Sequence, residues 1–274
     1  MKQDPRRAGF LVGAAQRALP GGRKYMKNKR AYFSQARNKG AIAILGGMGP
    51  EASAKMLEVM VSMAAEKFGA KDCRDFPEII VDSVPVPDFI SSKKNLPLAR
   101  KMLIGRVKKL NSFNVAGFAI ACNTAHILVG DLQRVAGAPF ISMIDSVSDE
   151  VVASGITKVG LLATPSTINS GLYQEGLSKN GINLILPTKA QMSCVEGVIR
   201  RVISKKNSGK DVKKLEKIAK SFEQKGARGI ILGCTELPLV FPKDFSLPVF
   251  DSIEILSMEL LAKYYKNGGK RYNE

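Results

Sequence analysis

Two cysteines, Cys122 and Cys234, each close an apolar stretch of the sequence and are followed by residues with hydrogen-bonding side chains. These flanking residues are Asn123 and Thr124 after the first cysteine and Thr235 after the second. A cysteine in an apolar stretch is most often a small core residue. Main-chain amides at the start of a following helix, however, favour the thiolate over the thiol. We therefore predict that Cys122 and Cys234 form a catalytic pair, with core packing as the alternative.

The other cysteines and the single histidine do not have the spacing of a metal site. Cys73 and Cys194 lack comparable polar neighbours, and we expect them to be structural. No CxxC pair occurs, so neither a zinc module nor a disulfide scaffold is predicted. His126 lies four residues after Cys122, where it could form a nucleophilic Cys–His pair or orient a loop by hydrogen bonding.

A glycine-rich turn, Gly46-Gly47-Met48-Gly49-Pro50, follows the first apolar segment. Glycine permits a tight turn and a close approach to a ligand, and Pro50 suits the first position of a helix. The spacing Gly47-x-Gly49-x-x-Ala52 also imitates a dinucleotide-binding fingerprint, for which Asp82 would be the ribose-binding acid, about ten residues later than usual. A nucleotide-binding oxidoreductase is therefore one alternative function, and a purely structural turn is the other interpretation.

From residue 40 onward the sequence alternates short apolar segments with longer helical patterns. The segments are nearly continuous and rich in β-branched residues, which is typical of strands covered on both faces. The clearest helical pattern spans 211–225, where apolar residues recur at helical spacing among lysines. Strands separated by helices predict parallel sheets and an α/β fold. The predicted strands are 41–47, 78–84, 115–122, 139–145, 158–164, 182–187, 229–234 and 247–251.

The predicted strands divide into two similar sets of four, which suggests an internal duplication. In each set one strand ends in a cysteine that is followed by threonine within two residues. We predict two small parallel-sheet α/β domains, the first formed by residues 40–140 with 248–274 and the second by 141–247. Because ligands bind at the carboxyl ends of strands in such sheets, the two thiols should face one cleft at the domain interface.

Composition excludes several classes of protein and sets the N-terminus apart. Apolar residues make up 45% of the 274 residues, enough for a sizeable core, and no apolar run reaches the roughly 18 residues that a membrane span needs. The net charge is +18, but residues 1–39 hold eleven Lys or Arg and a single acid, Asp4. We expect this basic extension to be disordered, with organelle targeting as a less favoured alternative. The sparse cysteines fit free thiols in a reducing compartment, so we expect a cytoplasmic protein. The modest charge of the remainder and the lack of a long apolar run predict that it binds neither nucleic acid nor membrane.

Four motifs together resemble the aspartate/glutamate racemase superfamily, nearest its aspartate racemase branch, in order and spacing over about residues 40–265. The resemblance implies two α/β domains related by a pseudo-twofold axis and an isomerase that needs no pyridoxal phosphate or other cofactor. In this family one cysteine removes the α-proton as a thiolate, while the other protonates the opposite face as a thiol. The matching motifs are Ile44-Leu45-Gly46-Gly47-Met48-Gly49-Pro50, Cys122-Asn123-Thr124-Ala125-His126, Val159-Gly160-Leu161-Leu162-Ala163-Thr164 and Gly233-Cys234-Thr235-Glu236.

The resemblance also implies a role for particular residues of this chain. Cys122 and Cys234 would be the two acid–base residues, and no metal would be bound. An amino acid, as a small-molecule ligand, would be the substrate, and a homodimer is the family's expected assembly. The residues that would contact the substrate are Met48, Asn123, Thr124, Ala125, Thr164 and Thr235.

Two positions depart from the pattern of aspartate racemases. An arginine that grips a substrate carboxylate often follows a Pro-Asp pair, whereas Phe89 follows Pro87-Asp88 here. A family lysine falls at either Ser204 or Lys205. A less acidic or larger amino acid would fit Phe89, so racemisation of another amino acid or of a hydantoin is an alternative to the aspartate/glutamate type. A non-catalytic amino-acid-binding protein is the remaining alternative.

Overall fold

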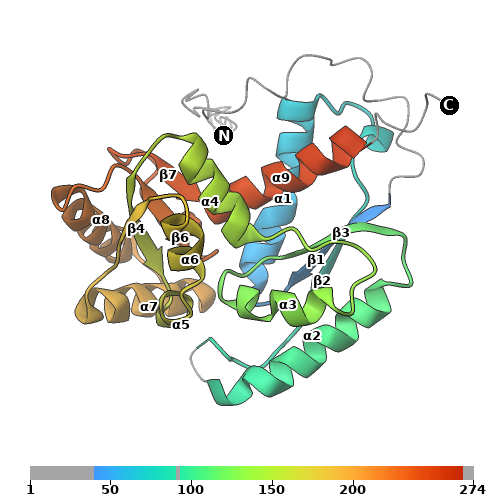
Figure 1. The fold of residues 1–274 in the computed structure, drawn as a ribbon, viewed down its shortest axis with the longest axis horizontal. Coiled ribbons are helices and arrows are strands. Elements are labelled where there is room, and N and C mark those ends of the chain that lie inside the picture. The colour runs from blue at the N-terminus through green and yellow to red at the C-terminus, as the bar shows by residue number, and fades with distance from the viewer. Residues whose placement is uncertain (1–39, 91–92, 268–274) are drawn as a thin grey trace, which may run out of the picture.

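The computed structural model describes residues 40–90 and 93–267, so the predicted basic extension at 1–39 lies outside the described residues. The described chain forms two parallel sheets with helices around them, as Figure 1 shows. The first sheet contains β1 (Ala41–Gly46), β2 (Ile79–Ser83) and β3 (Val115–Ile120) in the order β2-β1-β3. The second contains β4 (Lys158–Ala163), β5 (Asn183–Ile185), β6 (Ile230–Gly233) and β7 (Val249–Asp251) in the order β5-β4-β6-β7. The predicted α/β fold is confirmed, and the first three strands of each sheet share one spatial order.

Helices cover both faces of each sheet, which explains why the strands have no polar face. Ile42 and Ile44 of β1 pack with α1 and α9 on one side, whereas Ala43 and Leu45 pack with α2 and α3 on the other. Successive side chains point to opposite faces of a strand, so a sheet between two helical layers must be apolar on both. The helices are α1 (Pro50–Phe68), α2 (Leu96–Leu110), α3 (Val129–Gln133), α4 (Met143–Ala153), α5 (Pro165–Asn169), α6 (Leu172–Ser178), α7 (Lys189–Ile203), α8 (Gly209–Gln224) and α9 (Ser252–Asn267).

The predicted helix at 211–225 is α8, which begins two residues earlier than expected. Its apolar residues Leu215, Ile218 and Phe222 are buried in one cluster with α7 and with Leu162 of β4. This amphipathic pattern is what a helix on the outside of a sheet requires. Within residues 40–90 and 93–267, none of the helices combines the length and the apolar character that crossing a bilayer requires.

The second half of the fold differs from the sequence prediction at two places. The segment 139–145 is not a strand, because Phe140 makes only an isolated bridge to Phe118. Ser142 then accepts a hydrogen bond from the Asp145 N–H and caps α4, which ends the extended conformation. In addition, β7 pairs with β6 in the second sheet, although the sequence analysis grouped residues from 248 onward with the first domain.

After β7 the chain returns to the first sheet through α9, which runs beside α1 in Figure 1. Leu256 and Leu260 of α9 share a buried cluster with Met56 and Met60 of α1. This shared helix layer ties the second sheet to the first.

Candidate active site

A cavity of about 320 Å³ lies where the carboxyl ends of strands from both sheets come together. From the first sheet, its wall contains the turn after β1, the loop after β2 and the residues after β3. The second sheet contributes the residues after β4 and β6, together with one face of α7. Ligands bind at this edge of parallel α/β sheets, and the volume lies near the lower end of the roughly 300–1,000 Å³ usual for small-molecule pockets.

The two cysteines predicted to be catalytic both contribute to the wall of this cavity. Cys234 directly follows β6, whereas Cys122 stands two residues after β3 rather than inside the strand as predicted. Ala125 is fully buried, and its side chain is not part of the wall. The remaining predicted residues that line the cavity are Met48, Asn123, Thr124, Thr164 and Thr235.

The Cys122 thiol is buried, and its environment contains opposing influences. Its pKa is raised to about 12, first by burial and then by the negative charge of Glu236. The main-chain N–H groups of Ala125 and Thr124 act in the other direction and lower the pKa. Desolvation penalises the charged form, while donors aimed at the sulfur favour it. The short 3₁₀ segment Thr124–Leu128 therefore supplies donors to this sulfur.

The Cys234 thiol contacts a carboxylate directly. Its Sγ donates a hydrogen bond to Glu236 Oε2 at 3.0 Å, and the Thr235 hydroxyl donates to the same oxygen at 3.1 Å. The other oxygen, Glu236 Oε1, accepts the Gly49 N–H at 3.1 Å, from the turn after β1. Burial raises the pKa of Cys234 well above its ordinary value, and the charge of Glu236 and its hydrogen bond raise it further. Glu236 thus holds Cys234 as a thiol and joins the two halves of the site.

His126 is a loop-orienting residue, which was one of the two interpretations of the sequence. Its Nε2 accepts the Met143 N–H at 2.9 Å, so Nδ1 carries the proton that it donates to the Cys122 carbonyl oxygen at 2.9 Å. Burial lowers its pKa to about 4. Both ring nitrogens are therefore occupied by main-chain groups, and neither is available as a base for the neighbouring thiol.

Three buried threonine hydroxyls connect the two halves of the site. Thr124 Oγ1 lies 3.1 Å from Thr164 Oγ1 and 2.8 Å from Thr167 Oγ1. Thr164 also caps α5 by accepting the Thr167 N–H at 3.1 Å. The sequence analysis did not single out Thr167, although its place three residues after a Thr-Pro helix start could have indicated it.

The side chain of Asn123, predicted to contact the substrate, is already held by two protein groups. Its Oδ1 accepts the Tyr173 hydroxyl at 2.6 Å, and its Nδ2 donates to the Ser252 hydroxyl at 3.1 Å. Tyr173 and Ser252, which come from α6 and α9, carry no sequence signal that would have indicated this role. These contacts fix the loop that carries Cys122.

The glycine-rich turn has a structural role. Gly47 has a φ of +90°, and a Cβ there would lie 2.5 Å from the Val84 carbonyl oxygen, so the turn accepts only glycine. The Gly49 N–H, which a phosphate would need, already donates to Glu236. Asp82, the expected ribose-binding acid, forms an ion pair with Arg106 at 2.6 Å. These contacts favour the structural turn over a dinucleotide site.

The wall formed by α7 was not predicted from the sequence. Glu196, Ile199, Arg200 and Ile203 lie on one face of this helix and line the cavity opposite the loop at 86–90. Their spacing of three and four residues is the pattern that could have indicated a common face. Phe89, at the position of the missing arginine, is buried in the cavity wall with an exposure of 3%.

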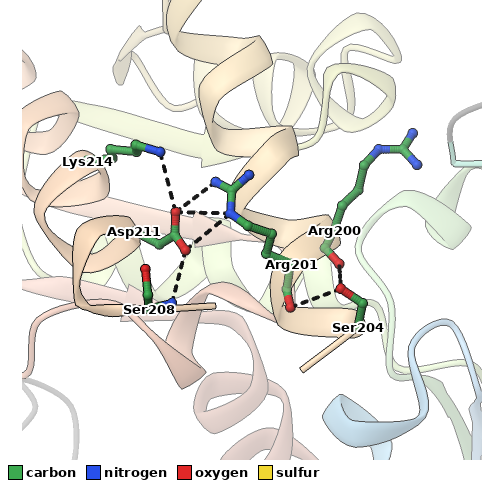
Figure 2. Close-up of polar contacts among 6 residues, drawn as sticks. All are labelled: Arg200, Arg201, Ser204, Ser208, Asp211 and Lys214. Atoms are coloured by element: carbon green, nitrogen blue, oxygen red, sulfur yellow. Dashed lines mark hydrogen bonds and ion pairs between the residues drawn. The ribbon is translucent and has the colours of Figure 1, made fainter. Parts of the chain in front are cut away.

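Neither candidate for the family lysine lines the cavity. The Ser204 hydroxyl donates to the main-chain oxygens of Arg200 and Arg201 at the end of α7, as Figure 2 shows. Lys205 forms an ion pair with Glu51. Among the described residues, no group of three or more His, Cys, Asp or Glu side chains is arranged to hold a metal ion.

The fold and the two buried thiols define an α/β protein in which a pair of cysteines lines one cavity between two parallel sheets. The chain belongs to the Asp/Glu/hydantoin racemase family, whose model matches residues 45–260. It is 25% identical over 224 residues to the broad specificity amino-acid racemase RacX of Bacillus subtilis (strain 168), covering 81% of this chain and 97% of that protein. Membership of a racemase family implies an isomerase, and it adds no support to the oxidoreductase alternative.

Solved structures of similar proteins agree with this assignment. An aspartate racemase homologue from Pyrococcus horikoshii OT3 is 30% identical with a TM-score of 0.70, covering 82% of this chain and 98% of that chain. The aspartate racemase of Picrophilus torridus is 29% identical with a TM-score of 0.72, covering 85% and 96% of the two chains. The resemblance noted in the sequence motifs therefore extends over most of the fold.

Proposed function

We propose that this chain is an amino-acid racemase in which Cys122 and Cys234 exchange protons with opposite faces of the substrate α-carbon. The observation that carries the proposal is that both thiols line one cavity, each after a strand at the equivalent position of its sheet. Inversion of a carbon centre needs an acid and a base on opposite sides. Two like groups from two similar sheets meet this requirement in both directions of the reaction.

The proposed step transfers two protons and no electrons. The thiolate of one cysteine takes the α-proton, so a C–H bond breaks and an S–H bond forms. The thiol of the other cysteine gives its proton to the opposite face, so its S–H bond breaks and a new C–H bond forms. The two sulfurs have then exchanged protonation states, and the free enzyme is reset by exchange with water.

The neighbours of the two thiols suggest which one begins as the base. The charge of Glu236 raises the pKa of both thiols, but only Cys234 also donates a hydrogen bond to this carboxylate, which raises its pKa further. Two main-chain N–H groups oppose the rise in pKa at Cys122, and one opposes it at Cys234. We assign Cys122 as the resting base and Cys234 as the resting acid. The substrate ammonium group, placed between them, would supply the positive charge that stabilises the Cys122 thiolate.

The polar groups around the thiols are suited to the α-carboxylate and to the carbanion that forms beside it. Thr164 and Thr235 line the cavity from the second sheet, and their hydroxyls already donate to Thr167 and Glu236. The donors offered to the substrate are the main-chain N–H groups of Thr124 and Ala125, which lie near Cys122. Fixed donors of this kind stabilise developing negative charge without reorganising. They would carry the role that a pyridine ring has in cofactor-dependent racemases. A cytoplasmic location, a homodimer and independence of pyridoxal phosphate stay predictions.

The test is proton exchange in deuterated water with single-cysteine variants. Incubated with a panel of L-amino acids, the wild-type protein should replace the α-proton by deuterium and form the D-enantiomer, as followed by NMR and chiral chromatography. Cys122→Ala and Cys234→Ala should each lose at least about a thousandfold in racemisation, whereas Cys194→Ala, on the outer side of α7, should keep it. Wild-type turnover in either catalytic-cysteine variant would contradict the two-thiol mechanism.

Measurements of ligand-induced stabilisation and of cofactor binding, made on the same proteins, separate the alternatives. A non-catalytic binding protein would be stabilised by an amino acid and would exchange no α-proton. An oxidoreductase would keep its affinity for a nicotinamide cofactor after both thiols were removed.

A further inference from the structure

We infer that the substrate carries an apolar, uncharged side chain, and that the pairing of Arg200 with Glu196 works against aspartate and glutamate. This inference rests on the proposed function, because it concerns the specificity of the same cavity. It is carried by the arrangement of apolar and charged side chains along the cavity wall.

The cavity has two chemically different parts. Hydroxyls, main-chain donors and the two thiols gather where the strands end, which suits the α-carboxylate and α-ammonium groups shared by all amino acids. The loop after β2 and the inner face of α7 contribute aliphatic and aromatic side chains instead. A substrate held by its polar groups beside the thiols therefore lays its side chain on an apolar surface, which favours apolar groups. This surface consists of Met48, Val86, Phe89, Ile90, Ile199 and Ile203.

Five of these six apolar side chains pack into the buried clusters beside the cavity, whereas Ile203 is 48% exposed. Phe89 and Met48 belong to the same buried cluster as Cys122. Ile203, at the end of α7, lies close to the glycine-rich turn. Its Cγ1 is 3.7 Å from the point where a Cβ on Gly49 would lie. A polar or charged side chain would lose its hydration against this surface without gaining a partner.

The charged residues of the wall point to the same conclusion. Arg200 is the one cation among the described residues that line the cavity, beside the carboxylates of Asp88, Glu196 and Glu236. The formal charge of the lining is therefore −2. Arg200 donates to Glu196 at 2.8 Å and lies 4.0 Å from Asp88, so its charge is already balanced. A substrate carboxylate would have to displace Glu196 from this pair in a field that repels it.

The neighbouring cations, Arg201 on α7 and Lys205 just after its end, are held by other acidic residues. Figure 2 shows the guanidinium groups of Arg200 and Arg201 directed to different sides of the helix. Arg201 reaches Asp211 on α8 at 2.7 Å, and Lys205 pairs with Glu51. Neither replaces the carboxylate-binding arginine whose position Phe89 occupies.

The test compares the two substrate classes by two independent measurements on the full-length protein. Rates of α-proton exchange in deuterated water are measured with L-methionine and L-leucine and with L-aspartate and L-glutamate, and the shift in melting temperature is measured with the same compounds. We expect kcat/KM for methionine or leucine to exceed that for aspartate at least tenfold, and only the apolar amino acids to raise the melting temperature.

A substitution tests the part assigned to the ion pair. Glu196→Gln removes one carboxylate partner of Arg200 and lowers the negative charge of the wall, so it should raise the aspartate-to-methionine ratio of kcat/KM at least fivefold. The matched control is Glu216→Gln on α8, which breaks the equivalent pair with Lys220 four residues along the helix, outside this cavity. This control should leave the ratio unchanged.

The outcomes separate the inference from the proposed function. Faster exchange or a larger melting shift with aspartate or glutamate overturns the inference and leaves the racemase standing. Melting shifts with apolar amino acids but no exchange overturn the racemase and support the inference. If neither class exchanges or binds, both fail. An unchanged ratio in Glu196→Gln overturns the role assigned to Arg200.

Discussion

Replacing Glu236 by glutamine should make Cys234 a far stronger nucleophile at neutral pH. The exchange is nearly isosteric, because the amide oxygen can still accept the Gly49 N–H while the charge beside the thiol disappears. At the 3.0 Å that separates Cys234 Sγ from Glu236 Oε2, an effective dielectric constant of about 20 gives a charge interaction of roughly 5 kcal/mol. Water that relaxes around the site reduces this value, and burial keeps part of the rise in pKa. We therefore expect the pKa of Cys234 to fall when the charge is removed.

The assay is alkylation by iodoacetamide across a pH series, followed residue by residue by peptide mass spectrometry. Only the thiolate reacts, so a larger thiolate fraction speeds alkylation. A less basic sulfur is also less nucleophilic, which reduces the logarithm of this rate gain by roughly half. Cys234 of Glu236→Gln should therefore react about ten- to a hundredfold faster at pH 8 than Cys234 of the wild type. The pH profile of racemisation should report the same fall in pKa. The alkaline limb of kcat/KM reflects loss of the proton from the acid thiol, so it should move to lower pH.

Two comparisons make this result interpretable. Glu196→Gln removes another carboxylate from the same cavity wall without touching Cys234, so it should leave the alkylation profile of Cys234 in place. Exposed Cys73 provides a reference for the reagent in every sample. If the alkylation profile of Cys234 is the same in Glu236→Gln and the wild type, the carboxylate does not control this thiol, and the assignment of Cys234 as the resting acid is wrong.

Three further predictions concern the scaffold. Because His126 has a folded pKa of about 4, below its ordinary 6.5, its stabilisation is present above pH 6.5 and is lost as the pH falls. Between pH 7 and 5 the wild type should lose about 2 kcal/mol more unfolding free energy than His126→Gln, as measured by urea denaturation. The variant is the reference because Asp251, with a pKa raised to about 7, changes stability in the opposite direction in both proteins. Equal losses in the two proteins would exclude this role of His126. Asp211→Asn should cost about 2 kcal/mol in urea unfolding, since buried Asp211 pairs with Arg201 and receives the Ser208 N–H; an unchanged midpoint would refute it. A protein that begins at Gly40 should keep kcat/KM within about twofold, and loss of turnover on truncation would show that residues 1–39 are needed.

The sequence predicted those parts of the fold whose determinants are local. Continuous apolar strands such as 41–47 have no polar face because helices cover both sides, and the pattern records that directly. The two thiols could be singled out because each follows such a strand, at the edge where parallel sheets bind ligands. The same reasoning predicted a strand at 139–145, and this prediction was wrong. The apolar residues of this segment serve an isolated bridge at Phe140 and then the buried start of α4, and periodicity alone does not separate these from a strand.

The parts of the site that escaped prediction are those defined by contacts between distant elements. Glu236 meets the Gly49 N–H across 187 positions of sequence, and Thr167 meets Thr124 from the other sheet. The apolar face of α7 reads as an ordinary amphipathic helix, because helical periodicity marks one buried face and does not tell a core from a cavity wall. The departure at Phe89 was visible in the sequence. Its effect on substrate specificity depends on Arg200 and Glu196, which are distant from Phe89 in sequence and line the same cavity only in the folded chain.

The difference between the two thiols has a consequence that the thermodynamics of racemisation constrains. Two free enantiomers have equal free energies, so kcat/KM must be the same in both directions however unequal the catalytic groups are. Glu236 contacts one thiol and not the other, and His126 engages the main chain behind Cys122 rather than either sulfur. In the proposed mechanism the two protonation forms of the free enzyme differ in energy, and each enantiomer is bound by only one of them. If the Glu236 charge acts on the bound forms as well, kcat and KM change together between the L and D substrates, and removal of this charge should bring the two pairs of constants closer.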